Sequence, residues 1–525
     1  MWLKPRKIKD DSCIRNYKAY VFYLPFISPL SPFIFPLPSP ISPLSMIYIL
    51  TFSLYFAVLL VLSRITGRHA DNDTFYMANR RSPWYVVAFG MIGASISGVT
   101  FVSVPGMVMR TDMTYMQTCI GFIFGYIAVA FILVPVYYKM NLTTIYTYLQ
   151  HRLGNRSYKT GAGFFVLSGI TGAAVRFYVA CMLLHRFVLA DTGMPFAATV
   201  CIMVACIWAY TRRGGVRTLV WTDTLQTLCM LAAVVLIIVK VAEAMDMTLT
   251  EAVATVASDA HSRIFVFDDW VSTQNFFKQF ISGIFIVIVM TGLDQNMMQK
   301  NLTCKTLREA QKDLCFGGMA FVPVNLLFLS LGILLLHLAA HTGTAIPSAG
   351  DELLPAFAAT GTLGTAVQVL FTLGVVAASF SSADSALTAL TTSCCVDIMG
   401  RQHDERLRHR VHLALAAAFI VFIMTFRAVN STSVIDAVYI LCSYTYGPLL
   451  GLFAFGLLTH RNVTDRLVPY IATASPVISF VIDTMTSHLT GYKFGYELLL
   501  LNGMITFAGL WMSGKYVLWV THHKT

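Results

Sequence analysis

Charged residues are scarce in this sequence of 525 residues. Asp, Glu, Lys and Arg make up 12% of the chain and hydrophobic residues 56%, whereas soluble domains carry about 25% charged residues. Such a composition excludes a soluble globular protein. The formal net charge of +11 does not indicate nucleic acid as a partner, because the basic residues lie mainly in short loops between apolar segments.

Motifs for enzyme chemistry and for metal sites are also missing. The eleven cysteines form no C-x-x-C pair, and neither an H-E-x-x-H motif nor a Cys/His cluster occurs. The run "GASIS" from Gly93 lacks the final Gly of a nucleophile elbow, and "GLWMSGKY" from Gly509 lacks the Ser or Thr of a P-loop. We therefore expect no cofactor, and a membrane-embedded enzyme is the less favoured class.

Thirteen apolar segments are long enough to cross the roughly 30 Å hydrocarbon core of a bilayer as helices. None shows the alternation of a membrane barrel strand, so the sequence predicts an all-α polytopic membrane protein with the lipid bilayer as a partner. Its oligomeric state stays open. The predicted spans are 46–64, 84–109, 117–138, 160–188, 193–211, 218–239, 276–299, 317–340, 365–398, 411–428, 434–459, 467–484 and 495–519.

Lys and Arg gather in one alternate set of loops, and Lys300 is counted among these loop charges. Because basic loops stay in the cytoplasm, the pattern predicts the plasma membrane, with the start of the first span outside and Thr525 inside. The basic loops are 64–81, 139–159, 212–217, 300–312, 401–410 and 461–466.

Residues 1–45 do not fit a membrane span. Seven prolines occur between Pro25 and Pro43, and proline at that density prevents a helix. Unpaired backbone is not tolerated in lipid, and the segment lacks the apolar core of a signal peptide. We expect this segment to be disordered, or the native chain to start at Met46.

One predicted span contains the polar run "AASFSSADSALTALTTS", residues 377–393, in which eight residues are Ser or Thr. Ala378, Ser381, Ser382 and Ser385 share one helix face. Hydroxyls can serve only close helix packing, but Asp384 adds a carboxylate, which is costly inside a membrane and usually functional. Oxygen ligands of this kind suit a hard cation.

Three further features stand out in other predicted spans. Glycine and proline interrupt span 84–109, which predicts a broken helix with free carbonyls, although glycine also permits close helix packing. Asp223 lies about one turn inside its span, with a lone interfacial Asp as the alternative. Arg176 lies in the middle of span 160–188, where the alternative is a structural partner for a helix C-terminus.

Four sequence blocks resemble the sodium:solute symporter family, which includes sodium/glucose, sodium/proline and sodium/sialic-acid cotransporters. The resemblance extends from about Met46 to Val520 and implies the LeuT-type fold. That fold has two inverted five-helix repeats, here residues 84–240 and 276–459, each starting with a broken helix. The four blocks are "GASISG…VPG", "RRGGVRTLVWTDTLQ", "GLDQNMMQKNL" and "AASFSSADSALTALTTSCCVDI".

The resemblance also implies the binding residues. The main sodium site takes the carbonyls of Gly93, Ile96 and Ala378 and the hydroxyls of Ser381 and Ser382. A second cation site takes Asp223, Ser381, Asp384 and Ser385, where Asp384 replaces the hydroxyl or small residue of many relatives and would suit a proton. The implied solute-binding residues are Ser97, Thr100, Arg176, Thr291, Asp294, Gln295, Tyr444 and Tyr446.

The sequence therefore predicts a secondary active transporter that moves Na+ and a small organic solute into the cell by alternating access. Arg176 indicates an anionic solute, such as an anionic sugar or a carboxylate. A proton-coupled transporter of the same fold is the alternative, favoured by Asp223 and Asp384.

Overall fold

The computed structural model of this protein describes residues 43–514, except 69, 188, 190–192, 271, 430–433 and 493. Within these residues the chain is helical, with one isolated bridge between Ser82 and Cys304. Ten helices are long and apolar enough to cross a membrane, or twelve if two bent helix pairs each count as one span. The prediction of an all-α polytopic protein is confirmed, whereas the number thirteen stays a prediction.

The long helices follow the predicted spans with small differences at their ends. The expectation for residues 1–45 falls almost entirely outside the described residues, although the first helix begins at Pro43. The long helices are α1 (Pro43–Thr66), α5 (Tyr115–Ala128), α8 (Asn155–Phe187), α9 (Phe196–Gly214), α10 (Val216–Ala244), α14 (Leu307–Thr342), α16 (Thr365–Ser393), α17 (Glu405–Val429), α18 (Val434–Leu458), α19 (Val468–Thr490) and α20 (Leu498–Ser513).

Shorter helical segments extend or connect these spans, and a search for span-length apolar windows cannot detect them. Two π-helical turns, η2 (Val129–Leu133) and η7 (Cys394–Ile398), continue α5 and α16. The other short segments are α2 (Asn72–Met77), η1 (Ala78–Arg80), α6 (Val134–Lys139), α7 (Thr147–Arg152), α11 (Leu249–Ser258), η4 (Ala260–Ser262), η6 (Gly350–Glu352) and α15 (Leu353–Ala358).

Two spans are broken in the middle, as predicted. Helices α3 (Trp84–Ser95) and α4 (Gly98–Thr111) meet at 58°, and the break lies at Ile96 and Ser97 rather than at Pro105. The second pair consists of α12 (Phe276–Val287) with η5 (Ile288–Gly292), followed by α13 (Gln295–Asn301) at 69°. Each predicted repeat thus begins with a bent pair.

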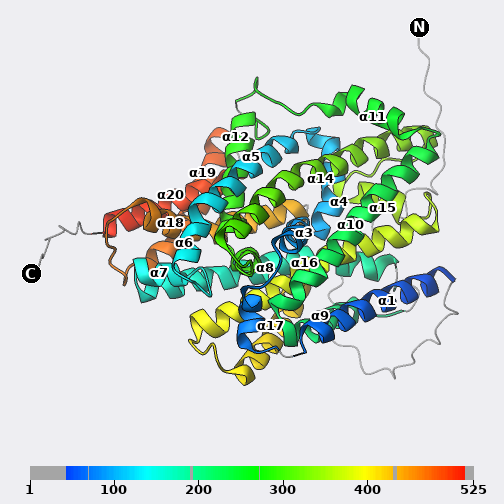
Figure 1. The fold of residues 1–525 in the computed structure, drawn as a ribbon. Coiled ribbons are helices and arrows are strands. Elements are labelled where there is room, and N and C mark those ends of the chain that lie inside the picture. Colours follow the sequence, from blue (N-terminus) through cyan, green and yellow to red (C-terminus); the bar gives the residue numbers. More distant parts are fainter. Residues whose placement is uncertain are drawn as a thin grey trace, which may run out of the picture. The chain divides into compact units, whose positions relative to one another are not determined.

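Helix α16 lies inside the bundle, where it packs against α3, α4, α8 and α10 (Figure 1). Every residue from Gly374 to Ser393 is buried. The eight hydroxyl side chains of this segment therefore face protein on all sides. Their polarity does not conflict with a membrane location, because none of them meets lipid.

The basic loops contact one another at one end of the bundle. The side-chain amide of Asn72 donates to the Gln402 carbonyl at 2.7 Å, and the backbone amide of Ser82 donates to the Thr303 carbonyl at 3.1 Å. These contacts join three loops that the charge pattern assigned to one side of the membrane.

Glycines allow two spans to touch through their backbones. A Cβ atom on Gly121 of α5 would lie 2.3 Å from the Phe280 carbonyl oxygen of α12, and one on Gly283 would lie 2.4 Å from the Thr118 carbonyl oxygen. Both distances are far below van der Waals contact, and the obstacle is backbone. The α5–α12 contact therefore requires glycine at both positions.

We expect Gly121→Ala to destabilise the protein by about 1–3 kcal/mol, the usual cost of overpacking. The thermal midpoint of the purified protein in detergent measures this effect. Gly163→Ala is the matched control, because a Cβ atom there meets nothing within 4 Å. Equal midpoints for the two variants would contradict the close backbone contact.

Candidate functional site

The hydroxyl face of α16 meets the first helix break. Ser382 Oγ lies 3.3 Å from the Ala94 carbonyl oxygen in the last turn of α3 and 3.4 Å from the Ala378 carbonyl oxygen. On the other side of the break, a Cβ atom at Gly98 would lie 1.9 Å from Ser379 Oγ. Helix α16 therefore contacts both halves of the broken span.

Oxygen atoms converge at this break. Ile96 ends α3 with φ −93° and ψ 88°, and Ser97 is extended before α4 starts. The last carbonyls of a helix have no partner within it, so those near Ile96 are available as ligands. The predicted main-site residues lie on the two elements that form this junction, with the Ser382 hydroxyl at the break and the Ser381 hydroxyl on Asp223.

The four residues of the predicted second cation site also lie together. Ser381 Oγ donates to Asp223 Oδ1 at 2.8 Å, and Ser385 Oγ lies 3.5 Å from Asp223 Oδ2. Ser385 Oγ is also 3.2 Å from Asp384 Oδ1, and the Tyr210 hydroxyl donates to Asp384 Oδ2 at 2.6 Å. Both carboxylates are fully buried.

Lys300 completes this second cluster, and its prediction as a loop charge is wrong. Its Nζ forms an ion pair with Asp223 Oδ2 at 2.7 Å, and the side chains of Lys300 and Asp223 are 2% and 0% exposed. Lys300 belongs to α13, whose position after a sharp bend cannot be read from hydropathy. Asp223 is therefore not a lone interfacial carboxylate.

A small cavity of about 90 Å³ lies between the two breaks. Four of the predicted solute-binding residues line it, namely Thr100, Arg176, Thr291 and Asp294. Arg176 Nε donates to the Gly172 carbonyl of its own helix at 3.1 Å, and the guanidinium also interacts electrostatically with Asp294. The cavity thus combines the Arg176 cation with the Asp294 carboxylate and the hydroxyl groups of two threonines.

The other four predicted solute-binding residues lie outside this lining. The hydroxyl of Tyr446 donates to Asp294 Oδ2 and so orients a residue that lines the cavity. Ser97 precedes α4 at the break, and the Tyr444 carbonyl accepts a hydrogen bond from Asn502. These contacts are structural, although Tyr446 and Ser97 adjoin the cavity residues.

Gln295 has a structural partner in the loop before α7. Its Oε1 accepts from the Ile145 amide at 2.9 Å.

The hydroxyl of Tyr137 donates to the Gly292 carbonyl at 2.8 Å, and that of Tyr146 donates to the Leu293 carbonyl at 2.9 Å. This region satisfies the carbonyls of the second break with side chains.

Sequence reasoning missed several polar residues of the cavity. Ser95 and Asn296 lie directly at the two breaks, so their positions in "GASISG" and "GLDQN" were a usable signal. Tyr126 of α5, whose hydroxyl is 3.2 Å from Ser95 Oγ, had no local signal because it occupies an ordinary apolar span.

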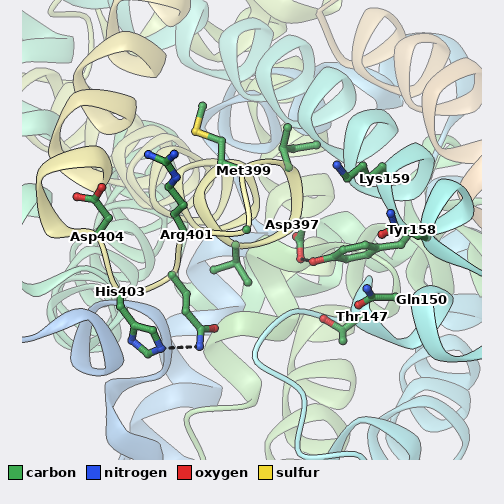
Figure 2. A pocket seen from close by; sticks show the side chains of 14 residues that line it. Thr147, Gln150, Tyr158, Lys159, Asp397, Met399, Arg401, His403 and Asp404 are labelled. Carbon is green, nitrogen blue, oxygen red and sulfur yellow. Dashed lines mark hydrogen bonds between the residues drawn. The ribbon is translucent and has the colours of Figure 1, made fainter.

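A second, larger cavity of about 820 Å³ opens among α7, α8 and the segment after α16 (Figure 2). Asp397 lies at its base and accepts hydrogen bonds from Thr144, from Tyr158 at 2.9 Å and from Ser393 at 2.6 Å. Both oxygens of this carboxylate are therefore engaged. No residue of either helix break lines the cavity, so it is separate from the site described above.

The family comparison matches the sodium:solute symporter family over residues 75–466. Among curated proteins, the sodium/sialic acid symporter NanT of Aliivibrio fischeri is 24% identical over 450 residues, which cover 82% of this chain and 86% of that protein. Human sodium-coupled monocarboxylate transporter 1 is 24% identical over 426 residues, which cover 77% of this chain and 67% of the relative.

Solved structures show the same fold. A Na+-coupled sialic acid symporter in a substrate-bound outward-open state aligns with a TM-score of 0.74 at 18% identity, covering 91% of this chain and 100% of that one. A nucleobase-cation-symport-1 family transporter aligns with a TM-score of 0.51 at 13% identity, covering 84% and 92%. The predicted LeuT-type fold is confirmed.

The buried ion pair predicts a strong, non-additive effect on stability. Asp223→Asn and Lys300→Gln should each destabilise the protein by about 3–5 kcal/mol, because each leaves one buried charge without a partner. The double variant should lose clearly less than the sum of the two. Unfolding in mixed detergent micelles measures all three values.

An exposed ion pair supplies the control. Lys240 and Glu243 lie 2.5 Å apart with side chains 44% and 55% exposed, so Lys240→Gln should change the unfolding free energy by less than about 1 kcal/mol. Additive losses in the Asp223 and Lys300 variants would show that the two charges do not interact.

Proposed function

This chain belongs to the sodium:solute symporter family, and from that premise we propose that it moves Na+ and a small carboxylate across the membrane together. The observation that carries the proposal is the junction of α16 with the α3–α4 break, next to a cavity that contains Arg176. The members of this family are transporters, which agrees with the prediction that the chain is not an enzyme.

The proposed main sodium site uses the carbonyls of Gly93, Ile96 and Ala378 with the hydroxyls of Ser381 and Ser382. Five neutral oxygens suit a hard monovalent cation. The ligands carry no charge, so the ion adds the only charge at the site. The position of Ser382 between the Ala94 and Ala378 carbonyls supports this assignment.

The same helix break couples sodium to the solute. Ala94 contributes its carbonyl to the junction with Ser382 and also lines the cavity, together with Ser95 and Thr100 on either side of the break. A sodium ion that fixes the break would therefore also order the cavity wall. Both ligands then favour one conformation, which is the requirement for coupled binding.

Arg176 favours a solute with one carboxylate. The guanidinium can bind a carboxylate through two parallel hydrogen bonds, and Thr100 and Thr291 offer hydroxyls to the rest of the molecule. The cavity has a volume of about 90 Å³. We therefore propose a small carboxylate as the solute.

We further propose the plasma membrane as the location, with the basic loops in the cytoplasm. That orientation places the C-terminus inside. A sodium gradient directed into the cell would drive inward transport of the solute. The contacts among the basic loops support their common side. Alternating access would then open the cavity first to one side and then to the other.

Proton coupling is the alternative, and one observation favours it. Asp384 is a second buried carboxylate beside Asp223, where a proton can neutralise it as well as a metal ion can. Solute uptake that follows a pH gradient and ignores sodium would support this alternative.

The central experiment measures binding of the solute by calorimetry at several sodium concentrations, with choline keeping the ionic strength constant. A thermal-shift comparison of short monocarboxylates with sialic acid selects the ligand. We expect sodium to tighten its binding about 5–150-fold, and the solute to tighten sodium binding equally. Ser381→Ala/Ser382→Ala should abolish the effect, and solute affinity independent of sodium would refute symport.

Arg176→Gln should weaken binding of the selected monocarboxylate about 10-fold or more, because a charge-assisted hydrogen bond is lost. The amide analogue of the same ligand should lose much less. Arg156→Gln is the matched control, since Arg156 lies on the same helix with its side chain exposed. Equal losses for acid and amide would assign Arg176 a structural role.

A further inference from the structure

Lys300 places a positive charge at the predicted second cation site. Its Nζ is 2.7 Å from Asp223 Oδ2, while Asp223 Oδ1 accepts from Ser381 at 2.8 Å. Both oxygens of the carboxylate that would attract a second sodium ion are therefore already in contact with side chains. An ammonium carries the same charge as a sodium ion.

The helix that carries Lys300 is held firmly in the bundle. All seven residues of α13 are buried, although most of them are polar. Gln299 Nε2 donates to Thr392 Oγ1 of α16 at 2.8 Å, and Asn301 Nδ2 donates to Asp313 of α14 at 2.7 Å. The residues on both sides of Lys300 are thus fixed, and its side chain, 2% exposed, is buried against Asp223.

The two buried carboxylates of the cluster require a positive charge nearby, which a lysine of the chain can supply. Asp223 and Asp384 are both fully buried, and Ser385 Oγ lies between them at 3.5 and 3.2 Å. Two carboxylates this close in a dry interior are very costly without a cation. The charge of Lys300 offsets one of them, and Tyr210 stabilises the other with a 2.6 Å hydrogen bond.

We propose that Lys300 acts as a tethered cation that fills the Asp223 site, so that this protein binds one sodium ion, at the main site, instead of two. The inference rests on the proposed sodium-coupled function. It assigns Asp223, Asp384 and Ser385 to a permanent ionic cluster rather than to an exchangeable metal site.

The test counts bound sodium directly, by equilibrium binding of radioactive Na+ to the purified full-length protein in the absence of solute. The wild type should bind one ion per chain. Lys300→Gln should bind two, because sodium can then take the place of the ammonium among the oxygens of Asp223, Ser381 and Ser385.

Three variants control this count. Lys300→Arg keeps the charge and should bind one ion. Lys300→Gln/Asp223→Asn removes the attracting carboxylate as well and should also return to one. Lys305→Gln changes an exposed lysine nearby and should match the wild type.

The wild-type count is decisive even if Lys300→Gln fails to fold. Two ions bound by the wild type would overturn the inference and leave sodium-coupled transport intact. A count of zero would instead refute the main sodium site and with it the proposed function. One ion in both the wild type and a folded Lys300→Gln would show that Lys300 does not occupy a sodium site.

Discussion

Inside a membrane, a broken helix exposes backbone groups that lipid cannot satisfy, and this constraint organises the interior of the protein. The two breaks are enclosed in different ways. At the second, Tyr137 and Tyr146 donate hydroxyls to the Gly292 and Leu293 carbonyls. At the first, α16 brings Ser382 next to the Ala94 carbonyl. Side-chain hydroxyls therefore meet carbonyls at both breaks, from α16 at the first and from two tyrosines at the second.

Buried charges, like the carbonyls at the breaks, are satisfied by side chains from neighbouring segments. Asp223 has Lys300, Asp397 has three hydroxyl donors and Asp294 has the Tyr446 hydroxyl. Each buried carboxylate is thus neutralised or hydrogen-bonded from a different helix. Arg176 donates a hydrogen bond from its guanidinium Nε to its own helix and lines a cavity together with Asp294.

Much of the fold and part of the site were predictable from the sequence. Hydropathy located the spans because each apolar segment must cross the bilayer, and the face of Ser381, Ser382 and Ser385 followed from helical spacing. The role of Lys300 was not predictable, because a lysine at the end of an apolar segment resembles an ordinary loop charge. Its partner Asp223 lies on another helix. The 69° bend before α13, which carries Lys300 towards Asp223, depends on tertiary contacts. Tyr126 was missed because it occupies an ordinary apolar span and gives no local signal.

The ion pair of Lys300 with Asp223 also bears on the energy available for transport. A lysine bound to the chain does not cross the membrane with the solute. If one sodium ion and one monocarboxylate move together, no net charge is transferred, and the membrane voltage, worth about 2.3 kcal/mol per charge per 100 mV, drives nothing. Accumulation is then limited to the concentration ratio of sodium itself. Such a carrier works equally well in polarised and depolarised cells, and it cannot concentrate its solute beyond that ratio.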